Sequence, residues 1–325
     1  GVVAVAGQEN EITKADVRRV IDAAKAVALP IDREILHILP QEFTVDEQHG
    51  IKDPVGMSGV RLEAEAHIVT GAITSAQNIY RSISRADIQV MDLVLEPLAS
   101  SYAVLGEDEK ELGVVVMDLG GGTTDIAMFF EGCIRHTSVV GLGGRNVTND
   151  IAIGLRTPVE QAEQIKIQHG SAIHNKDERD LIIEVPDVGG RPPRKISKTY
   201  LVDIVQPRME EILSLANQEI KKSNYVHLMT AGLVLTGGGS LLHGTVELAE
   251  QIFDMPVKLG VPERFIGFTD LVKSPIHATG VGLVHYGMHH RFQSNDLLGD
   301  SEHGLFNWVI GRMRRWFNGV HKYVN

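Results

Sequence analysis

The stretch VVVMDLGGGTTDIAMFF, residues 114 to 130, decides which fold this 325-residue chain can adopt. Two apolar runs surround a glycine turn, so the sequence predicts a strand that ends at Asp118, a turn at residues 120–122 and a second strand. Glycines let a backbone approach a ligand closely, and successive N–H groups in such a turn can bind an anion. A plain glycine-rich hairpin is the alternative, but an Asp at the strand end followed by GGGTT favours phosphate binding. No Walker sequence, GxxxxGK[ST], is present, and a strand rather than a helix follows the turn.

A second glycine turn lies in AGLVLTGGGSLLHG, residues 231 to 244. An apolar strand leads into Gly237, Gly238 and Gly239, and Ser240 is placed to cap a helix that begins near Leu241. A helix N-terminus below a glycine turn favours anions. A dinucleotide-binding strand-turn-helix unit is the alternative, and it is disfavoured because the turn comes late in the chain without an early βαβ unit.

Composition limits the classes of function. The chain carries a formal net charge of −11, but residues 305–325 carry four cations and no acid. The acidic body argues against nucleic acid as a partner, and a basic end on such a body is typical of proteins that bind membrane surfaces. No apolar run is long enough to cross a membrane, and the first residues do not resemble a signal peptide. The single cysteine, Cys133, suits a reducing cytoplasm.

The basic end holds both tryptophans of the chain, in GLFNWVIGRMRRWFNGV, residues 304 to 320. At 100° per residue its apolar side chains gather on one face and its cations on the opposite face, which predicts an amphipathic helix in a membrane interface. A helix docked on its own domain is the alternative, but a polar, aperiodic segment at 287–304 predicts a flexible linker. The predicted membrane-binding residues are Leu305, Phe306, Trp308, Val309, Ile310, Arg312, Met313, Arg314, Arg315, Trp316, Phe317, Val320 and Lys322.

The remaining elements follow from periodicity and from residues that begin or end helices. Thr13 is placed to cap a helix with Asp16 at its third position, and Pro30 to end it. The acidic run at 107–111 indicates a solvated turn. Strands that alternate with helices predict an α/β protein. The expected segments are a helix at 11–30, β structure at 35–70, a helix at 75–84, helices at 141–168, loops with one short strand at 171–198, and a helix at 200–223.

Together, the two glycine motifs resemble the second phosphate motif and the adenosine motif of the actin-like ATPase superfamily. EPLASSYAVL (96–105) resembles the helix that connects its two lobes, and SPIHATGVGLVHYG (274–287) resembles the return connection. Within the superfamily, the segment from GQENEITK to EAHIV (7–69) resembles a subdomain specific to the FtsA family of bacterial cell-division proteins. RTPVEQAEQIKIQHG (156–170), VGGRPPRKISK (188–198) and IVQPRMEEIL (204–213) resemble its fourth subdomain and the helix before it.

This resemblance implies an actin-like two-lobe ATPase fold, with ribonuclease H-like lobes and an FtsA-type inserted subdomain. The superfamily's first phosphate loop, a hairpin with D-x-G-[ST], is not found, so half of the phosphate cradle is expected here. The implied divisions are the inserted subdomain (1–72), the rest of the first lobe (73–113), the core of the second lobe (114–142 and 226–286), the fourth subdomain (143–225), the linker (287–304) and the membrane-targeting helix (305–325).

The resemblance also implies the nucleotide contacts. Gly120, Gly121, Gly122 and Thr123 would contact the phosphates of ATP, and Asp118 would hold Mg²⁺ through water. Gly237 to Gly239 would contact the adenosine. Glu163 and Lys166 would approach the ribose, although from their i,i+3 spacing alone a surface ion pair is the plainer interpretation.

Proteins of this family bind ATP, assemble into actin-like filaments and tether FtsZ polymers to the cytoplasmic face of the cell membrane at the division site. The implied partners are the C-terminal tail of FtsZ, further copies of the chain, anionic lipids and downstream division proteins. Arg208 and Glu211 are expected to meet the FtsZ tail, with a solvated helix face as the alternative. A pilus-assembly actin homologue and a sugar kinase stay open as alternatives, and the sequence leaves ATP turnover undecided.

Overall fold

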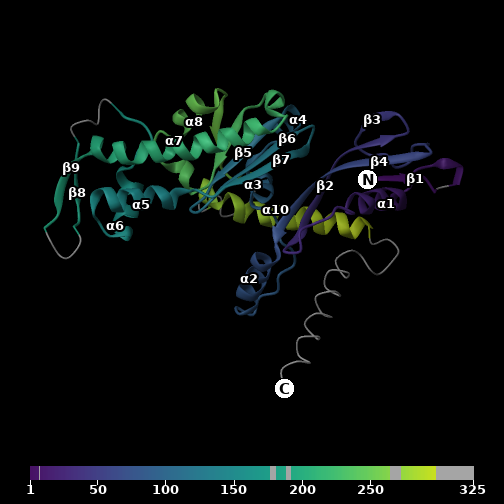
Figure 1. Ribbon diagram of the computed structural model, residues 1–325, viewed down its shortest axis with the longest axis horizontal. Helices are drawn as coiled ribbons and strands as arrows, with labels where there is room; N and C mark the ends of the chain where they lie inside the picture. The colour runs from purple at the N-terminus through teal and green to yellow at the C-terminus, as the bar shows by residue number, and fades with distance from the viewer. Residues whose placement is uncertain (7, 176–180, 188–191, 264–271, 298–325) are drawn as a thin grey trace, which may run out of the picture. The chain divides into compact units, whose positions relative to one another are not determined.

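The computed structural model describes residues 1–6, 8–175, 181–187, 192–263 and 272–297 (Figure 1). The chain divides into two compact units, residues 1–283 and residues 284–325. The described part of the first unit contains three β-sheets. In the second unit, the described residues continue a helix.

A five-stranded sheet forms the core of the first unit, in the order β11-β10-β5-β6-β7. β5 (Val114–Leu119) and β6 (Thr124–Phe130) are the strands predicted around the first glycine turn, and they pair antiparallel. β7 (Cys133–Val140) extends this meander, whereas β10 (Leu233–Thr236) and β11 (Val257–Leu259) run parallel to β5. Every residue of β5 is buried, as expected for a central strand that is covered on both faces.

Helices cover this sheet, and the alternation of side chains along β5 divides them between its faces. Val115, Met117 and Leu119 pack in one cluster with residues of α5 (Gly144–Leu155), α7 (Lys198–Lys222) and α8 (Thr245–Phe253). α3 (Glu96–Val104) contacts the same strand, and its Ser100 bonds to Asp118, which alternates with these three residues. The connecting segment predicted at 96–105 is therefore a helix packed on the sheet.

The segment between β7 and β10 is mostly helical, as predicted. α6 (Val159–His169) packs against α5, and α7 lies along α5 (Figure 1). The sequence predicted one strand between α6 and α7. The structure has an antiparallel pair there, β8 (Ile182–Val185) and β9 (Arg194–Ser197). β9 was missed because the four residues RKIS are too few and too polar to show an alternating pattern.

The N-terminal part of the first unit forms a separate antiparallel sheet, in the order β1-β4-β2-β3. Its strands are β1 (Val2–Ala4), β2 (Arg33–Val45), β3 (Gln48–Ile51) and β4 (Arg61–Ala72), which confirms the β structure expected at 35–70. α1 (Lys14–Ala24) packs on this sheet, and Val20 of α1 is fully buried beside Phe43 and Leu62. The predicted helix ends before Pro30, at Ala24.

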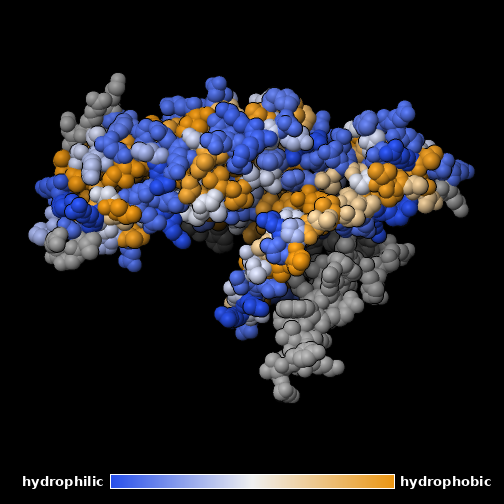
Figure 2. All heavy atoms as spheres, viewed as in Figure 1, coloured by the Kyte–Doolittle hydropathy of each residue, from blue (hydrophilic) through white to orange (hydrophobic). Residues whose placement is uncertain are grey.

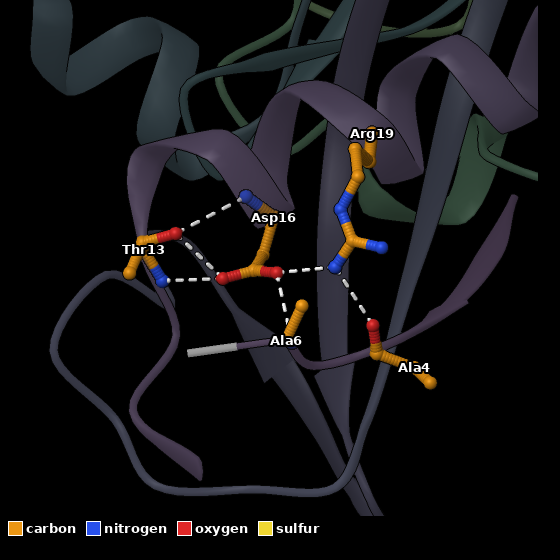
Figure 3. A network of polar contacts seen from close by, with 5 residues as sticks. All are labelled: Ala4, Ala6, Thr13, Asp16 and Arg19. Atoms are coloured by element: carbon orange, nitrogen blue, oxygen red, sulfur yellow. Dashed lines mark hydrogen bonds and ion pairs between the residues drawn. The ribbon is translucent and has the colours of Figure 1, made fainter. Parts of the chain in front are cut away.

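The start of α1 is held by a network around the buried carboxylate of Asp16 (Figure 3). Thr13 caps the helix as predicted, and its backbone N–H and hydroxyl donate to Asp16 Oδ2 at 2.9 and 2.6 Å. The N–H of Ala6 donates to Asp16 Oδ1 at 3.1 Å, and Arg19 pairs with the same oxygen while it donates to the carbonyl of Ala4 at 2.8 Å. One side chain therefore joins α1 to the segment that contains β1.

Short helices complete the unit. α2 (Ile73–Ser84) confirms the helix expected at 75–84. The solvated turn expected at 107–111 is wrong, because α4 (Glu107–Leu112) forms there. Glu109 accepts a hydrogen bond from the N–H of Gly106 at 2.7 Å, which satisfies a donor at the helix start. Four 3₁₀ turns lie among the described residues: η1 (Gln8–Asn10), η3 (Val226–Leu228), η4 (Gly238–Leu241) and η5 (Pro275–His277).

α10 (Ala278–Leu297) begins in the first unit and continues into the second. The linker predicted at 287–304 is therefore wrong over residues 287–297, which are helical. These residues contain no glycine or proline after Gly287, so the polar sequence can continue the helix at little cost. The rest of the predicted linker and the predicted amphipathic helix, residues 298–325, lie outside the described residues.

Hydrophilic residues cover much of the face shown in Figure 2, and hydrophobic residues gather in separate groups between them. Single exposed apolar side chains, such as Ile31 and Ile153, are common on protein surfaces. Within the described ranges, every helix is too short or too polar to cross a membrane.

Candidate functional site

The two glycine turns lie at the same edge of the five-stranded sheet. β5 and β10 are parallel neighbours, with Asp118 opposite Thr236, so residues 120–122 and 237–239 follow two adjacent strand ends. In α/β proteins, ligands bind at the carboxyl ends of such strands. Two turns separated by more than a hundred residues are thus brought to one site.

Close packing explains two glycines of the second turn. Gly237 has φ +82°, and a Cβ atom there would collide with the carboxylate of Asp118 and lie 2.7 Å from the carbonyl oxygen of Leu119. A Cβ atom on Gly239 would collide with the side chain of Leu119. Around Gly238 there is more room, with Ile276 at 3.8 Å from a Cβ atom. Gly237 and Gly239 therefore let the two strand ends pack together, and Gly238 leaves space beside them.

The first turn has both free donors and free space. Gly120 donates to the carbonyl of Thr123 at 3.0 Å, but the hydrogen bonds among the described residues leave the N–H groups of Gly121, Gly122 and Thr123 without an acceptor. A Cβ atom on Gly121 or Gly122 would meet no protein atom within 4 Å. Successive N–H groups without an acceptor, in a turn with open space at its glycines, are suited to an anion with several oxygens.

The start of α5 is fastened to this turn, which the sequence did not predict. The N–H groups of Gly144 and Arg145 donate to the carbonyls of Gly120 and Gly121 at 2.9 and 2.7 Å. A Cβ atom on Gly143 would collide with the backbone of the turn, 2.6 Å from the carbonyl oxygen of Gly120. The signal in the sequence was GLGG at 141–144, but nothing local shows what these glycines pack against.

Asp118 lies beneath the turns and is only 3% exposed. Its Oδ2 accepts hydrogen bonds from Ser100 at 2.7 Å and from Thr279 at 3.1 Å. Burial raises the pKa of Asp118, and the two hydroxyl donors oppose this effect. Asp125 lies opposite Asp118 on β6, accepts from Thr123 at 2.7 Å, and also has a pKa raised by burial.

This carboxylate chemistry fits Mg²⁺ held through water. Among the described residues, no three His, Cys, Asp or Glu side chains are arranged to hold a metal ion directly. Mg²⁺ keeps several of its waters and uses one or two carboxylates plus phosphate oxygens. Because Asp118 already accepts two hydroxyls on Oδ2 and lies against Gly237, contact through water suits it better than direct coordination.

Sequence reasoning missed Glu96, the first residue of α3. Burial raises the pKa of Glu96 to about 7, together with the charges of Asp118 and Asp125, while a hydrogen bond from Thr279 lowers it. The available signal was an acid at the start of a helix whose following residues are almost all buried. A carboxyl with a pKa near neutrality can accept or donate a proton at physiological pH.

Glu96→Gln is expected to make the chain more stable above neutral pH. The folded protein holds the Glu96 proton at pH values where the unfolded chain has lost it, so the free energy of unfolding falls as pH rises from about 4.5 to about 7. Because the Glu96 residue is exposed and solvent weakens the shift, we expect a gain of only about 1 kcal/mol at pH 8. Thermal unfolding at pH 5 and pH 8 measures this. An equal difference between the two proteins at both pH values would contradict it.

Glu163 and Lys166 lie together, but their roles differ. Lys166 Nζ donates to Glu163 Oε2 at 2.8 Å, to Thr148 Oγ1 at 2.9 Å and to the carbonyl of Gly144 at 3.1 Å. These contacts use the three protons of the ammonium group, so Lys166 fastens α6 to the start of α5. Burial raises the pKa of Glu163. The hydrogen bonds from Lys166 and Thr148 outweigh this effect and hold the pKa below its usual value. Glu163 Oε1 has no partner among the described residues and can accept a hydroxyl.

The helix predicted after the second glycine turn begins later than expected. Ser240 lies in the 3₁₀ turn η4, and its hydroxyl donates to the carbonyl of Gly237 at 2.6 Å instead of capping a helix. Leu242 is extended and Gly244 has φ +76°, so α8 starts only at Thr245. The second turn therefore does not present an α-helix N-terminus.

Arg208 and Glu211, the predicted partner residues, lie on α7. Arg208 pairs with Asp150 of α5 through two hydrogen bonds, from Nε to Oδ2 at 2.5 Å and from Nη2 to Oδ1 at 3.2 Å, and it also pairs with Glu211. The hydrogen bond to Asp150 raises the pKa of Arg208, which is already high. An acidic partner would have to share this guanidinium with Asp150.

Solved structures show the class to which this fold belongs. The chain superposes on MreB5 of Spiroplasma citri bound to ADP with a TM-score of 0.57 and 17% identity, over 71% of this chain and 69% of that one. It superposes on a PilM-PilN type IV pilus biogenesis complex with a TM-score of 0.58 and 16% identity, over 88% and 75%. With the paired glycine turns, this likeness defines an actin-like ATPase fold that carries an inserted subdomain, as expected from the sequence.

Comparison with sequence families narrows this class. The family model described as "Cell division protein FtsA" matches residues 115–282, and the one described as "SHS2 domain inserted in FTSA" matches residues 1–70. The chain is 48% identical to cell division protein FtsA of Pseudomonas aeruginosa over 325 residues, covering 98% of this chain and 77% of that protein. It is 43% identical to that of Escherichia coli strain K12 over 286 residues, covering 86% and 68%. The chain therefore belongs to the FtsA family of cell-division proteins, which confirms the predicted resemblance.

Proposed function

We propose that this chain binds ATP with Mg²⁺ and acts as a membrane adaptor in cell division. In this role it assembles into actin-like filaments and holds FtsZ polymers on the cytoplasmic face of the cell membrane at the division site. The observation that supports nucleotide binding is the first glycine turn, where three successive N–H groups have no acceptor among the described residues and the Cβ positions of Gly121 and Gly122 are open. Membership of the FtsA family supports the role in division.

In this proposal, each part of ATP is assigned to a group at the site. The N–H groups of Gly121, Gly122 and Thr123 would bind phosphate oxygens, and Asp118 would hold Mg²⁺ through water. Bound Mg²⁺ supplies positive charge that offsets the phosphates. Glu163 Oε1 would accept a ribose hydroxyl, and the adenosine would lie over Gly238, where the second turn leaves space.

The adaptor role assigns the other predicted residues. Residues 305–325 would lie in the membrane interface, where an apolar face is buried and cations meet anionic lipids. The FtsZ tail would dock on α7 at Arg208 and Glu211, in competition with Asp150. The inserted subdomain would meet downstream division proteins and the next subunit of a filament.

Deletion of residues 305–325 is expected to remove FtsZ from sedimenting vesicles that contain anionic lipid. Each cation near an anionic surface contributes about 1 kcal/mol, and the apolar face contributes further. FtsZ polymers, vesicles and this chain are mixed, and the FtsZ in the pellet is measured. The amount of FtsZ in the pellet should fall to the amount found when this chain is left out.

Two single substitutions provide a matched control. Phe317→Asp places a charge on the predicted apolar face and should reduce FtsZ in the pellet strongly, whereas Asn318→Asp adds the same charge to the polar face and should reduce it little. If the shortened chain brings as much FtsZ to lipid as the whole chain, the tether does not exist.

A further inference from the structure

Arg145 is a cation at the first glycine turn that the proposed contacts do not use. It is the second residue of α5, and its backbone N–H donates to the carbonyl of Gly121 at 2.7 Å. Its side chain is exposed, and within the described ranges its guanidinium has neither an ion pair nor a hydrogen bond. It is therefore anchored next to the three free N–H groups with its charge unmatched.

The position is electrostatically unusual. The first turn of a helix favours acids and disfavours cations, because its N–H groups carry partial positive charge. The first N–H groups of α5 are already used by the carbonyls of Gly120 and Gly121, so the helix end is not itself a free anion site. Arg145 therefore adds positive charge at a helix end that is already positive, and none of the described residues pairs with its guanidinium.

A polyphosphate bound at the turn would add negative charge to a region that already contains acids, so it needs a nearby cation. Two buried acids, Asp118 and its partner across the strand pair, Asp125, lie on the strands that flank the turn and add negative charge there. The nearby Lys166 has all three protons engaged, so it is not free to bind phosphate. Arg145 has five N–H donors in a geometry that matches phosphate oxygens.

We propose that Arg145 contacts the β- and γ-phosphates of a nucleoside triphosphate held at the glycine turn, and so favours ATP over nucleotides with fewer phosphates. This inference rests on the proposed binding of ATP. The long side chain extends from a backbone that is already bonded to the turn, so little rearrangement is needed to reach a phosphate above Gly121.

The test uses the whole chain and titration calorimetry with ATP, ADP and AMP at fixed Mg²⁺. Arg145→Gln should weaken ATP binding about tenfold and change AMP binding less than twofold, since charge-assisted hydrogen bonds to phosphate are lost. Arg145→Lys should keep part of the ATP affinity, because the charge stays and the fork geometry is lost. Arg156→Gln, at the other end of α5 and also exposed, is the matched control and should change ATP binding less than twofold.

The outcomes separate this inference from the proposed function. If the unsubstituted chain binds ATP and Arg145→Gln binds it equally well, the role of Arg145 is wrong and nucleotide binding stands. An equal loss of AMP and ATP affinity would also overturn the inference, because the contact would then not lie at the outer phosphates. If the unsubstituted chain binds no nucleotide, both fail.

Discussion

Gly121→Val is expected to weaken ATP binding by at least about 100-fold while the chain stays folded, the loss expected when two charge-assisted hydrogen bonds are removed. A Cβ atom on Gly121 meets no protein atom within 4 Å, and Gly121 is not among the residues with positive φ. The protein can therefore accept the side chain. The valine would fill the space in front of the N–H groups of Gly122 and Thr123, where phosphate oxygens would lie.

Gly287→Val is a matched control for this change. Gly287 also has no protein atom within 4 Å of its Cβ position, but it lies in the second unit, on α10. Titration calorimetry measures the ATP affinity of both variants, and thermal unfolding measures their stability. Similar affinities for Gly121→Val and the unsubstituted chain would show that the turn does not bind phosphate.

Local patterns were enough to predict the elements that carry the candidate site. Apolar runs in the sequence predicted β5, β6 and β10, and the glycines between or after these runs predicted the turns. The pairing of β5 with β10 joins residues that are more than a hundred positions apart. No local pattern contains that pairing, so the resemblance to a known superfamily was needed to place the two turns together.

What the sequence did not predict depends on contacts between distant residues. Lys166 was expected to face the ribose, but Gly144 and Thr148 supply acceptors from another helix and occupy its protons. Arg208 was expected on a partner surface, and its pairing with Asp150 depends on how α5 and α7 pack. The raised pKa of Glu96 arises from burial and from two acids on β5 and β6. The propensities of single segments contain none of this information.

Asp16→Asn is expected to destabilise the inserted subdomain by about 3 kcal/mol. Asp16 is 2% exposed, and its two oxygens accept from two backbone N–H groups, the Thr13 hydroxyl and Arg19 (Figure 3). An amide keeps the shape but replaces one acceptor oxygen by a donor, which leaves buried donors unsatisfied and Arg19 without its partner. Hydrogen exchange of the amides in α1, compared with those in β5, measures the opening of this subdomain alone.

The pH dependence gives an independent test of the same network. Hydrogen bonds from the side chain and backbone of Thr13, and from Arg19, hold the pKa of Asp16 far below its usual value. Its contribution to stability is therefore present above the unfolded value of about 3.9 and is lost as pH falls below it. The difference between Asp16→Asn and the unsubstituted chain should shrink between pH 4 and pH 2, because over this range the unfolded chain takes up a proton that the folded carboxylate does not.

Asp22→Asn is the control on the same helix, because Asp22 is 62% exposed and, among the described residues, forms its ion pair with Lys25 at the surface. Its effect should stay below about 0.5 kcal/mol, since exposed ion pairs contribute little. If both variants open α1 equally often, the buried carboxylate is not what holds this helix to the segment of β1. A large effect of Asp16→Asn alone would show that one buried acid, satisfied from four directions, stabilises the packing of α1 on its sheet.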